Sequence, residues 1–360
     1  MFVRAFSTFF LFYLFAISAA SAQGLSTLVR EPRSMAMGGS GVALADDEFA
    51  LFHNPAGLAG IETRRFKIVG FSFEASLGTY EAVGTSIDVF KNFKIGSLNS
   101  LMGKDIALRA DLIPIIQLPH FAITYFVDAQ GGIDEYNQAN PQFRIGEMIT
   151  HGVQAGMGFN LLKERKASED LRVGAAVKML WRKGGYSDIY TAGFLQASKN
   201  GKQFLKDLVG EYGLGYGADL GIQYVKHAGK ATKLYFGSSI TDIGGTHFSD
   251  PRAMAMPMNT SIGVGAEKTL DLLKIKFDFD VRNLGQDVAF ANKTHIGTEL
   301  SFRLLDVDLG LNQFNLTYGV SFDVWVLKVS AMSFAEEYGI TYHQNVSRKY
   351  LLQIDFSLPI

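Results

Sequence analysis

The chain contains no cysteine, only eight prolines in 360 residues, and almost no net charge. Without cysteine there is no disulfide, thiolate metal site, cysteine nucleophile or lipid-modified N-terminal cysteine. The 34 basic and 35 acidic residues give a net charge of −1, so neither a nucleic-acid partner nor an acidic tail is indicated. No stretch after residue 22 has the roughly 18 consecutive apolar residues of a transmembrane helix.

Catalytic motifs are also missing. The chain has no Gly-x-Ser-x-Gly, no His-Glu-x-x-His and no Gly-Lys-Ser/Thr. Its seven histidines are scattered, and none stands at metal-ligand spacing from a second ligand. We therefore predict a protein that is not an enzyme and that has neither a cofactor nor a metal site.

The first 22 residues have the pattern of an export signal. Arg4 provides a short positive region, residues 6–17 form an apolar run of signal-peptide length, and residues 20–22 (ASA) form a small-x-small cleavage site. We expect cleavage before Gln23 and delivery to the outer membrane of a Gram-negative cell. A retained N-terminal anchor is the alternative.

From residue 65 onward, apolar and polar residues alternate along most of the chain. In one segment, for example, Ile275, Phe277 and Phe279 alternate with Lys276 and Asp278. A period of two over about 9–13 residues indicates strands with one apolar and one polar face. About fourteen such segments are present, at residues 65–75, 106–116, 120–130, 148–161, 170–183, 212–225, 232–242, 259–269, 273–282, 293–305, 306–313, 317–324, 325–335 and 349–358.

The length and number of these segments favour a membrane barrel over a soluble sandwich. They are longer than the 5–6 residues usual in globular strands, and match the roughly 9–11 residues that cross a bilayer at a tilt. Aromatic residues lie near the segment ends, as in interfacial girdles: Trp181, Tyr224, Phe302, Phe322, Trp325 and Tyr350. We predict an all-β fold, a transmembrane antiparallel β-barrel of about 14 strands formed by residues 63–360.

Charge decides which face of each strand meets the lipid. A Lys or Arg at mid-bilayer costs roughly 2–4 kcal/mol, so the charged phase must face the lumen. The residues concerned are Lys276, Asp278, Asp280, Arg282, Glu299, Arg303, Asp306 and Asp308. A polar lumen lined by hydrated salt bridges is favoured over a substrate site. The face formed by Gly213, Gly215, Gly217 and Gly221 is either a groove for the N-terminal segment or a bend in the wall.

Residues 33–60 carry the densest local pattern. Gly38, Gly39 and Gly41 permit close backbone packing and unusual backbone angles. Asp46 is predicted as a helix N-cap with Asp47 in the first turn. The helix is expected to end at Asn54, because Pro55 disfavours the α region there.

This stretch resembles the N-terminal plug, or hatch, of the outer-membrane long-chain fatty acid transporter (FadL/TodX-like) superfamily. The similar elements are residues 37–41 (MGGSG), 45–47 (ADD) and 54–56 (NPA). The same elements are similar to those of PorV-like and conjugal-transfer TraF-like barrels. The resemblance implies that residues 23–62 form a plug inside the barrel; the plug motif would comprise Gly38, Gly39, Gly41, Asp46, Asp47, Asn54 and Pro55.

Two segments, near residues 88–104 and 188–210, lack the alternation. We expect helix-bearing extracellular loops there. The second has apolar residues that could collect a hydrophobic ligand: Phe194, Leu195, Phe204, Leu205 and Leu208. Loop caps or partner-docking surfaces are the equal alternative.

Two functions follow from the resemblance. The first is passive uptake of hydrophobic molecules, such as long-chain fatty acids, through a barrel gated by its plug. The second is an accessory barrel that binds protein partners in a secretion or conjugation system. In both, the barrel would be in contact with outer-membrane lipid.

Overall fold

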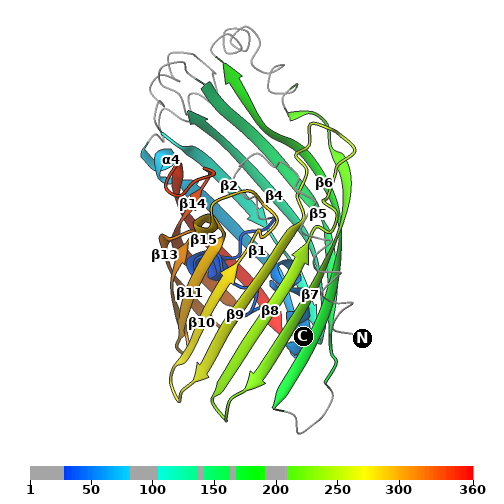
Figure 1. The fold of residues 1–360 in the computed structure, drawn as a ribbon, viewed down its shortest axis with the longest axis vertical. Helices are drawn as coiled ribbons and strands as arrows, with labels where there is room; N and C mark the ends of the chain where they lie inside the picture. Colours follow the sequence, from blue (N-terminus) through cyan, green and yellow to red (C-terminus); the bar gives the residue numbers. More distant parts are fainter. Residues whose placement is uncertain are drawn as a thin grey trace.

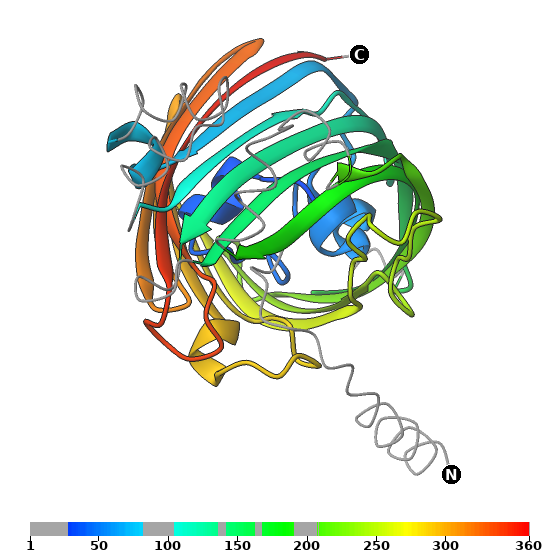
Figure 2. The same cartoon turned by 90° about the horizontal axis from the view of Figure 1, so that it is seen from above.

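The computed structural model describes residues 28–81, 104–135, 142–162, 168–190, 207 and 209–359. Its strands form one antiparallel sheet in which each strand pairs with its neighbours along the chain, except that β2 and β3 pair with β1 and β4 and not with each other. The last strand pairs with the first over residues 65–76, which closes the sheet into a barrel (Figures 1 and 2). The strands are β1 (Arg65–Ser76), β2 (Ile106–Leu112), β3 (Ile115–Leu118), β4 (Phe121–Glu135), β5 (Gln142–Asn160), β6 (Glu169–Tyr190), β7 (Gly213–His227), β8 (Thr232–Thr241), β9 (Asn259–Thr269), β10 (Lys274–Val281), β11 (Thr294–Ser301), β12 (Leu305–Asn312), β13 (Asn315–Val324), β14 (Leu327–Glu337) and β15 (Val346–Pro359).

One wall position is divided between two short strands. Both β2 and β3 lie between β1 and β4, and the chain between them is Ile113-Pro114. Proline has no N–H for the ladder, so the strand is interrupted there. The fifteen strands therefore fill fourteen wall positions, and the predicted fourteen-stranded barrel is confirmed.

The two faces of the wall have the predicted polarity. On β10, Asp278 and Asp280 are fully buried inside the barrel, whereas Phe277 is 44% exposed on the outside. The lumen also holds Lys276, Glu299 and Asp308, each of them buried. The prediction was wrong for Arg303, which lies exposed in the turn between β11 and β12, because the strand ends at Ser301. Asp306 is half-buried beside Lys328, and Arg282 lies half-buried at a lumen cavity.

The two rims of the barrel differ in the length of their connections. One rim has short turns, such as Trp325-Val326, where Trp325 is 87% exposed. The other rim has long connections, such as residues 242–258. In outer-membrane barrels the short turns are periplasmic and the long loops extracellular, and we name the two rims of this barrel by that convention.

The N-terminal segment lies inside this barrel (Figure 2). It contains the short helices α2 (Pro32–Ala36) and α3 (Ala50–His53) and the 3₁₀ helix η2 (Pro55–Gly60). Helix α2 packs on β12 to β15, and η2 packs on β5 to β7, so the segment crosses the lumen. Among the helices whose bounds lie within the described residues, only α4 (Leu77–Glu81) and η3 (Phe290–Lys293) are not part of the N-terminal segment. No helix within the described part of the chain is long and apolar enough to cross a membrane.

Candidate functional site

The plug contacts the wall where the wall has glycine. A Cβ atom on Gly174 would collide with the backbone of Pro55 and Ala56, and one on Gly310 with that of Met37 and Gly38. A Cβ atom would likewise collide with plug backbone at Gly237 and Gly297, which face Val42 and Met37, and with plug side chains at Gly221 and Gly319, which face Asn54 and Ala36. The absence of a side chain lets two backbones approach closely. These glycines therefore form the seat of the plug.

The predicted glycine face of β7 divides into two parts. Gly221 faces the plug at Asn54 and Ala56, as the groove interpretation requires. Gly213, Gly215 and Gly217 instead face the extracellular connection at residues 246–250. That connection is held inside the lumen by hydrogen bonds and by a bridge between Gly215 and Phe248.

The glycine run of the plug has the backbone angles that only glycine adopts easily. Gly38 and Gly39 have φ of +74° and +76°, and Gly41 has φ of +143°. Gly38 also lies against the carbonyl oxygens of Ile296 and Leu311, where a Cβ atom has no room. Substitution here would strain the plug against β11 and β12.

Asp46 is not the helix N-cap that the sequence predicts. Helix α3 begins at Ala50, and Phe49 precedes it without a side-chain cap. Asp47 Oδ1 instead accepts a hydrogen bond from the Phe49 N–H at 2.9 Å. Asp46 pairs with Arg33 and with Lys276 of β10, each at 2.7 Å.

Arg33 is the centre of the ion pairs that join plug and wall. Its guanidinium contacts Asp46 at 2.7 Å, Asp47 at 3.1 Å and Glu299 of β11 at 2.5 Å. Lys276 also contacts Glu299, at 3.2 Å. Burial alone would raise the pKa of Asp46, but Arg33 and Lys276 hold that pKa well below its usual range. We call this cluster of Arg33, Asp46, Asp47, Lys276 and Glu299 the latch.

A buried acid and a buried histidine meet at the centre of the plug. His53 Nε2 lies 2.7 Å from Glu31 Oε2. Burial raises the pKa of Glu31 to about 7 and lowers the pKa of His53 to about 3. The imidazole is therefore neutral at physiological pH, and the carboxyl group is the one that takes up a proton.

Asn54 ties the plug together and attaches it to β7. Its side chain is fully buried, and Nδ2 donates to the carbonyl oxygens of Val42 at 2.9 Å and Ile222 at 3.2 Å. Oδ1 accepts from the Ala56 N–H at 3.2 Å, at the start of η2. Pro55 is the first residue of η2, so the predicted end of helix α3 before it is confirmed.

We expect Asn54→Ala to lower the free energy of unfolding by about 2–3 kcal/mol, because two buried carbonyl groups lose their donor. Urea titration of the protein in lipid vesicles would measure this loss. Asn160→Ala is the matched control, since Asn160 bonds to Asp170 and Leu162 at an exposed periplasmic turn. Equal stability of the two variants would show that Asn54 does not fix the plug.

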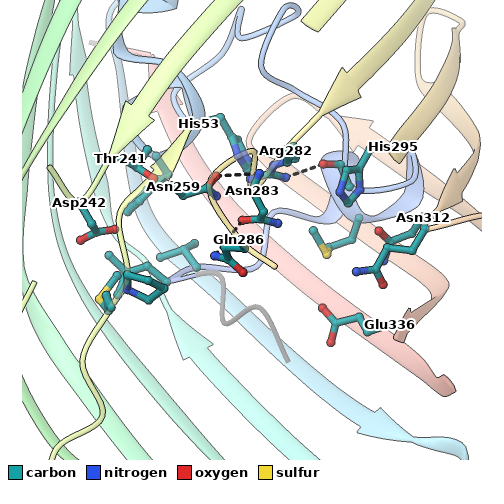
Figure 3. A pocket seen from close by; sticks show the side chains of 18 of the residues that line it. His53, Thr241, Asp242, Asn259, Arg282, Asn283, Gln286, His295, Asn312 and Glu336 are labelled. Carbon is teal, nitrogen blue, oxygen red and sulfur yellow. Dashed lines mark hydrogen bonds between the residues drawn. The ribbon is translucent and has the colours of Figure 1, made fainter. Parts of the chain in front are cut away.

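A cavity of about 120 Å³ lies in the lumen beside the plug. His53, Asp242, Arg282, His295 and Glu336 line its polar side (Figure 3). Its apolar side is formed by Leu28, Val29, Met35, Phe52, Met256 and Pro257. His295 Nδ1 donates a hydrogen bond to the Gly38 carbonyl oxygen, 2.8 Å away, which fixes the ring beside the plug.

The apolar side of the cavity continues into a buried apolar cluster. Ile113 and Ile115 point inward at the interruption between β2 and β3, and they pack with Val29, Phe49, Phe126, Leu180 and Met256. The sequence predicts a polar lumen, and this was wrong on the β2–β6 side, where the lumen holds this apolar cluster. No local pattern marks the cluster, because residues 112–116 are apolar on both faces.

The predicted apolar ligand residues of the second loop, Phe194, Leu195, Phe204, Leu205 and Leu208, lie outside the described residues. So do residues 88–103 of the first loop. Within the described ranges, no group of three acidic, histidine or cysteine side chains is placed to hold a metal ion.

Several solved structures of other proteins are similar to this fold. The Ralstonia pickettii toluene transporter TbuX matches over 93% of this chain and 99% of its own, with a TM-score of 0.50 and 15% identity. The chain has the fold of the FadL/TodX-like barrels. The CymD monoaromatic hydrocarbon channel matches at a TM-score of 0.49 and 13% identity, and the Pseudomonas putida toluene transporter TodX at 0.45 and 12%. They cover 93% of this chain, and 99% and 98% of their own lengths.

No family model matches the sequence, and no curated protein does so either. The barrel fold that the resemblance of residues 33–60 implies is thus supported by a solved structure rather than by sequence similarity.

Proposed function

We propose that the protein is an outer-membrane channel for the passive uptake of small apolar molecules, gated by its plug. The observation that supports this best is the apolar cluster inside an otherwise charged lumen, next to a cavity. Buried apolar side chains on the water-facing side of a barrel wall have no role in lipid contact. Such side chains suit an apolar ligand that is transferred out of water.

The size of the cavity favours a small ligand. A cavity of about 150 Å³ lined by apolar side chains binds benzene, and the lumen cavity measures about 120 Å³. TbuX, which has the same fold, is a toluene transporter. A long-chain fatty acid would need the plug to move before it could enter.

The interrupted wall position offers the ligand a route into the membrane. Between β2 and β3 the ladder is interrupted at Pro114. The gap is bridged on the β4 side by the Thr124 hydroxyl, which donates to the Pro114 carbonyl oxygen at 2.6 Å, and on the β1 side by the Ile113 N–H, which donates to the Gly70 carbonyl oxygen at 2.7 Å. Ile113 and Ile115 lead from the cavity side to this point. A ligand that passed here would enter lipid without crossing the charged lumen.

The plug would act as the gate because it covers the apolar cluster from the lumen and is itself held to the wall. Val29, Phe49 and Phe52 cover the apolar cluster from the lumen, while the latch holds the same segment to β10 and β11. Uptake would therefore require a shift of the plug, and we expect no catalytic step.

We expect Leu28→Trp to lower toluene uptake into whole cells by about tenfold, because the indole would fill the apolar side of the cavity. A tenfold lower rate requires the barrier to toluene passage to rise by only about 1.4 kcal/mol. The control is Leu272→Trp, at a periplasmic turn where Leu272 is 86% exposed. Unchanged uptake in Leu28→Trp would contradict the proposal. Stoichiometric secretion-system proteins retained by the purified barrel, without any uptake, would favour the accessory role instead.

A further inference from the structure

A shallow apolar groove lies on the lipid-facing side of the barrel, away from the plug and the lumen cavity. It has a volume of about 630 Å³ and runs over β12 to β15 and β1. Strands β13, β14 and β15 lie together on one side of the barrel (Figure 1). The groove follows from side-chain size, because β14 presents the small residues Ala331 and Ser333 between Tyr318 of β13 and Tyr350 of β15.

Arg348 closes the extracellular end of this groove. It lies two residues above Tyr350 on β15, and its Nη1 donates to the Leu316 carbonyl oxygen of β13 at 2.6 Å. Ser333 Oγ is 3.5 Å from the same nitrogen. A guanidinium group has five N–H donors, and Nε and Nη2 of Arg348 bond to no protein atom among the described residues. Donors that can bind an anion are therefore left at the head of the groove.

The position of the groove along the membrane normal matches the outer leaflet. Strand β15 ends at Pro359 on the periplasmic side, eleven residues below Arg348. With a rise of about 3.3 Å per residue and a tilt of about 40°, Arg348 stands roughly 28 Å above that end, just beyond an apolar band about 25 Å tall. Ala331 and Ser333 pair with Leu352 and Tyr350, which places the groove in the outer half of the band.

We propose that the groove binds one acyl chain of a phosphorylated, acylated glycolipid of the outer leaflet, with a phosphate held by Arg348. The apolar groove suits the acyl chain. The planar guanidinium group of an arginine suits a phosphate, to which it can donate two hydrogen bonds. A second copy of the barrel would bring another apolar face and would leave the free donors of Arg348 without an anion. The proposal rests on the outer-membrane location given above, but not on transport through the lumen.

Native mass spectrometry of the detergent-purified full chain, titrated with lipid A, tests this proposal. We expect one lipid A per chain. Arg348→Gln should weaken binding by about tenfold, because it keeps a donor for Leu316 but loses the charge-assisted contact. Arg348→Lys should restore part of the binding, and Ala331→Phe should abolish it by filling the groove.

The controls are Arg303→Gln, at an exposed periplasmic turn, and Ala218→Phe, on the lipid-facing side of β7. Both should bind as the unchanged chain does, and heat-modifiable migration would show that every variant is folded. If Arg348→Gln and Ala331→Phe bound lipid A as tightly as the unchanged chain does, the proposal would be overturned. So would equal affinity for phosphatidylglycerol, or an effect of Ala331→Phe on dimer formation alone.

Discussion

Arg33→Ala is expected to destabilise the protein by about 3 kcal/mol, because it removes the only plug cation of the latch from the buried Glu299 and the half-buried Asp46 and Asp47. Asp46, Asp47 and Glu299 all lie within 3.1 Å of the Arg33 guanidinium. After the substitution, Lys276 alone would face Asp46 and Glu299. Urea titration in lipid vesicles would give the change in the free energy of unfolding.

Arg252→Ala is the matched control for this experiment. Arg252 also forms an ion pair, with Asp250 at 2.9 Å, but its side chain is 49% exposed on an extracellular connection. Exposed pairs contribute little because water screens them. If both variants lost the same stability, the latch would not be what holds the plug to β10 and β11.

Gly174→Leu is expected to unseat the plug at a cost of about 3 kcal/mol, the upper end of the usual range for overpacking. The atoms nearest to a Cβ on Gly174 are backbone atoms of Pro55 and Ala56, which cannot turn away as a flexible side chain can. Trypsin would report the result, since Arg30 and Arg33 are protected in a seated plug and cleavable in a released one.

Gly285→Leu provides the matched control for Gly174→Leu. A Cβ on Gly285 has open space around it, so the plug should stay protected. The barrel of Gly174→Leu should still form, since the clash is with the plug rather than with a neighbouring strand. Full protection of Arg30 and Arg33 in Gly174→Leu would contradict the close fit between plug and wall.

The alternation of apolar and polar residues along the sequence was sufficient to locate the strands of the barrel wall. The predicted strand at 259–269 is β9, residue for residue, and that at 232–242 differs from β8 by one residue. The predictions at 148–161 and 170–183 were too short, because β5 and β6 continue at their extracellular ends to Gln142 and Tyr190. Beyond the bilayer no apolar face is needed, so the alternation fades although the strands continue.

The site was harder to predict because its contacts are distant in sequence. Asp46 looks like a local helix cap, yet its partner Lys276 lies 230 residues away. The glycines of the wall could be counted but not matched with the plug, because their partners are set by closure of the barrel. The resemblance of residues 33–60 identified the plug segment, whereas the apolar cluster at Ile113 and Ile115 left no readable signal.

The most direct test of a plugged fourteen-stranded barrel is its conductance in a planar lipid bilayer, measured for the chain that begins at Gln23 and for the same chain without residues 28–61. Side chains fill an 8-stranded barrel, and barrels of 16–18 strands leave an aqueous channel. We therefore predict an almost closed mature protein and large, steady channel openings once the segment is removed. Equal conductance of the two chains, whether both open or both closed, would contradict the account.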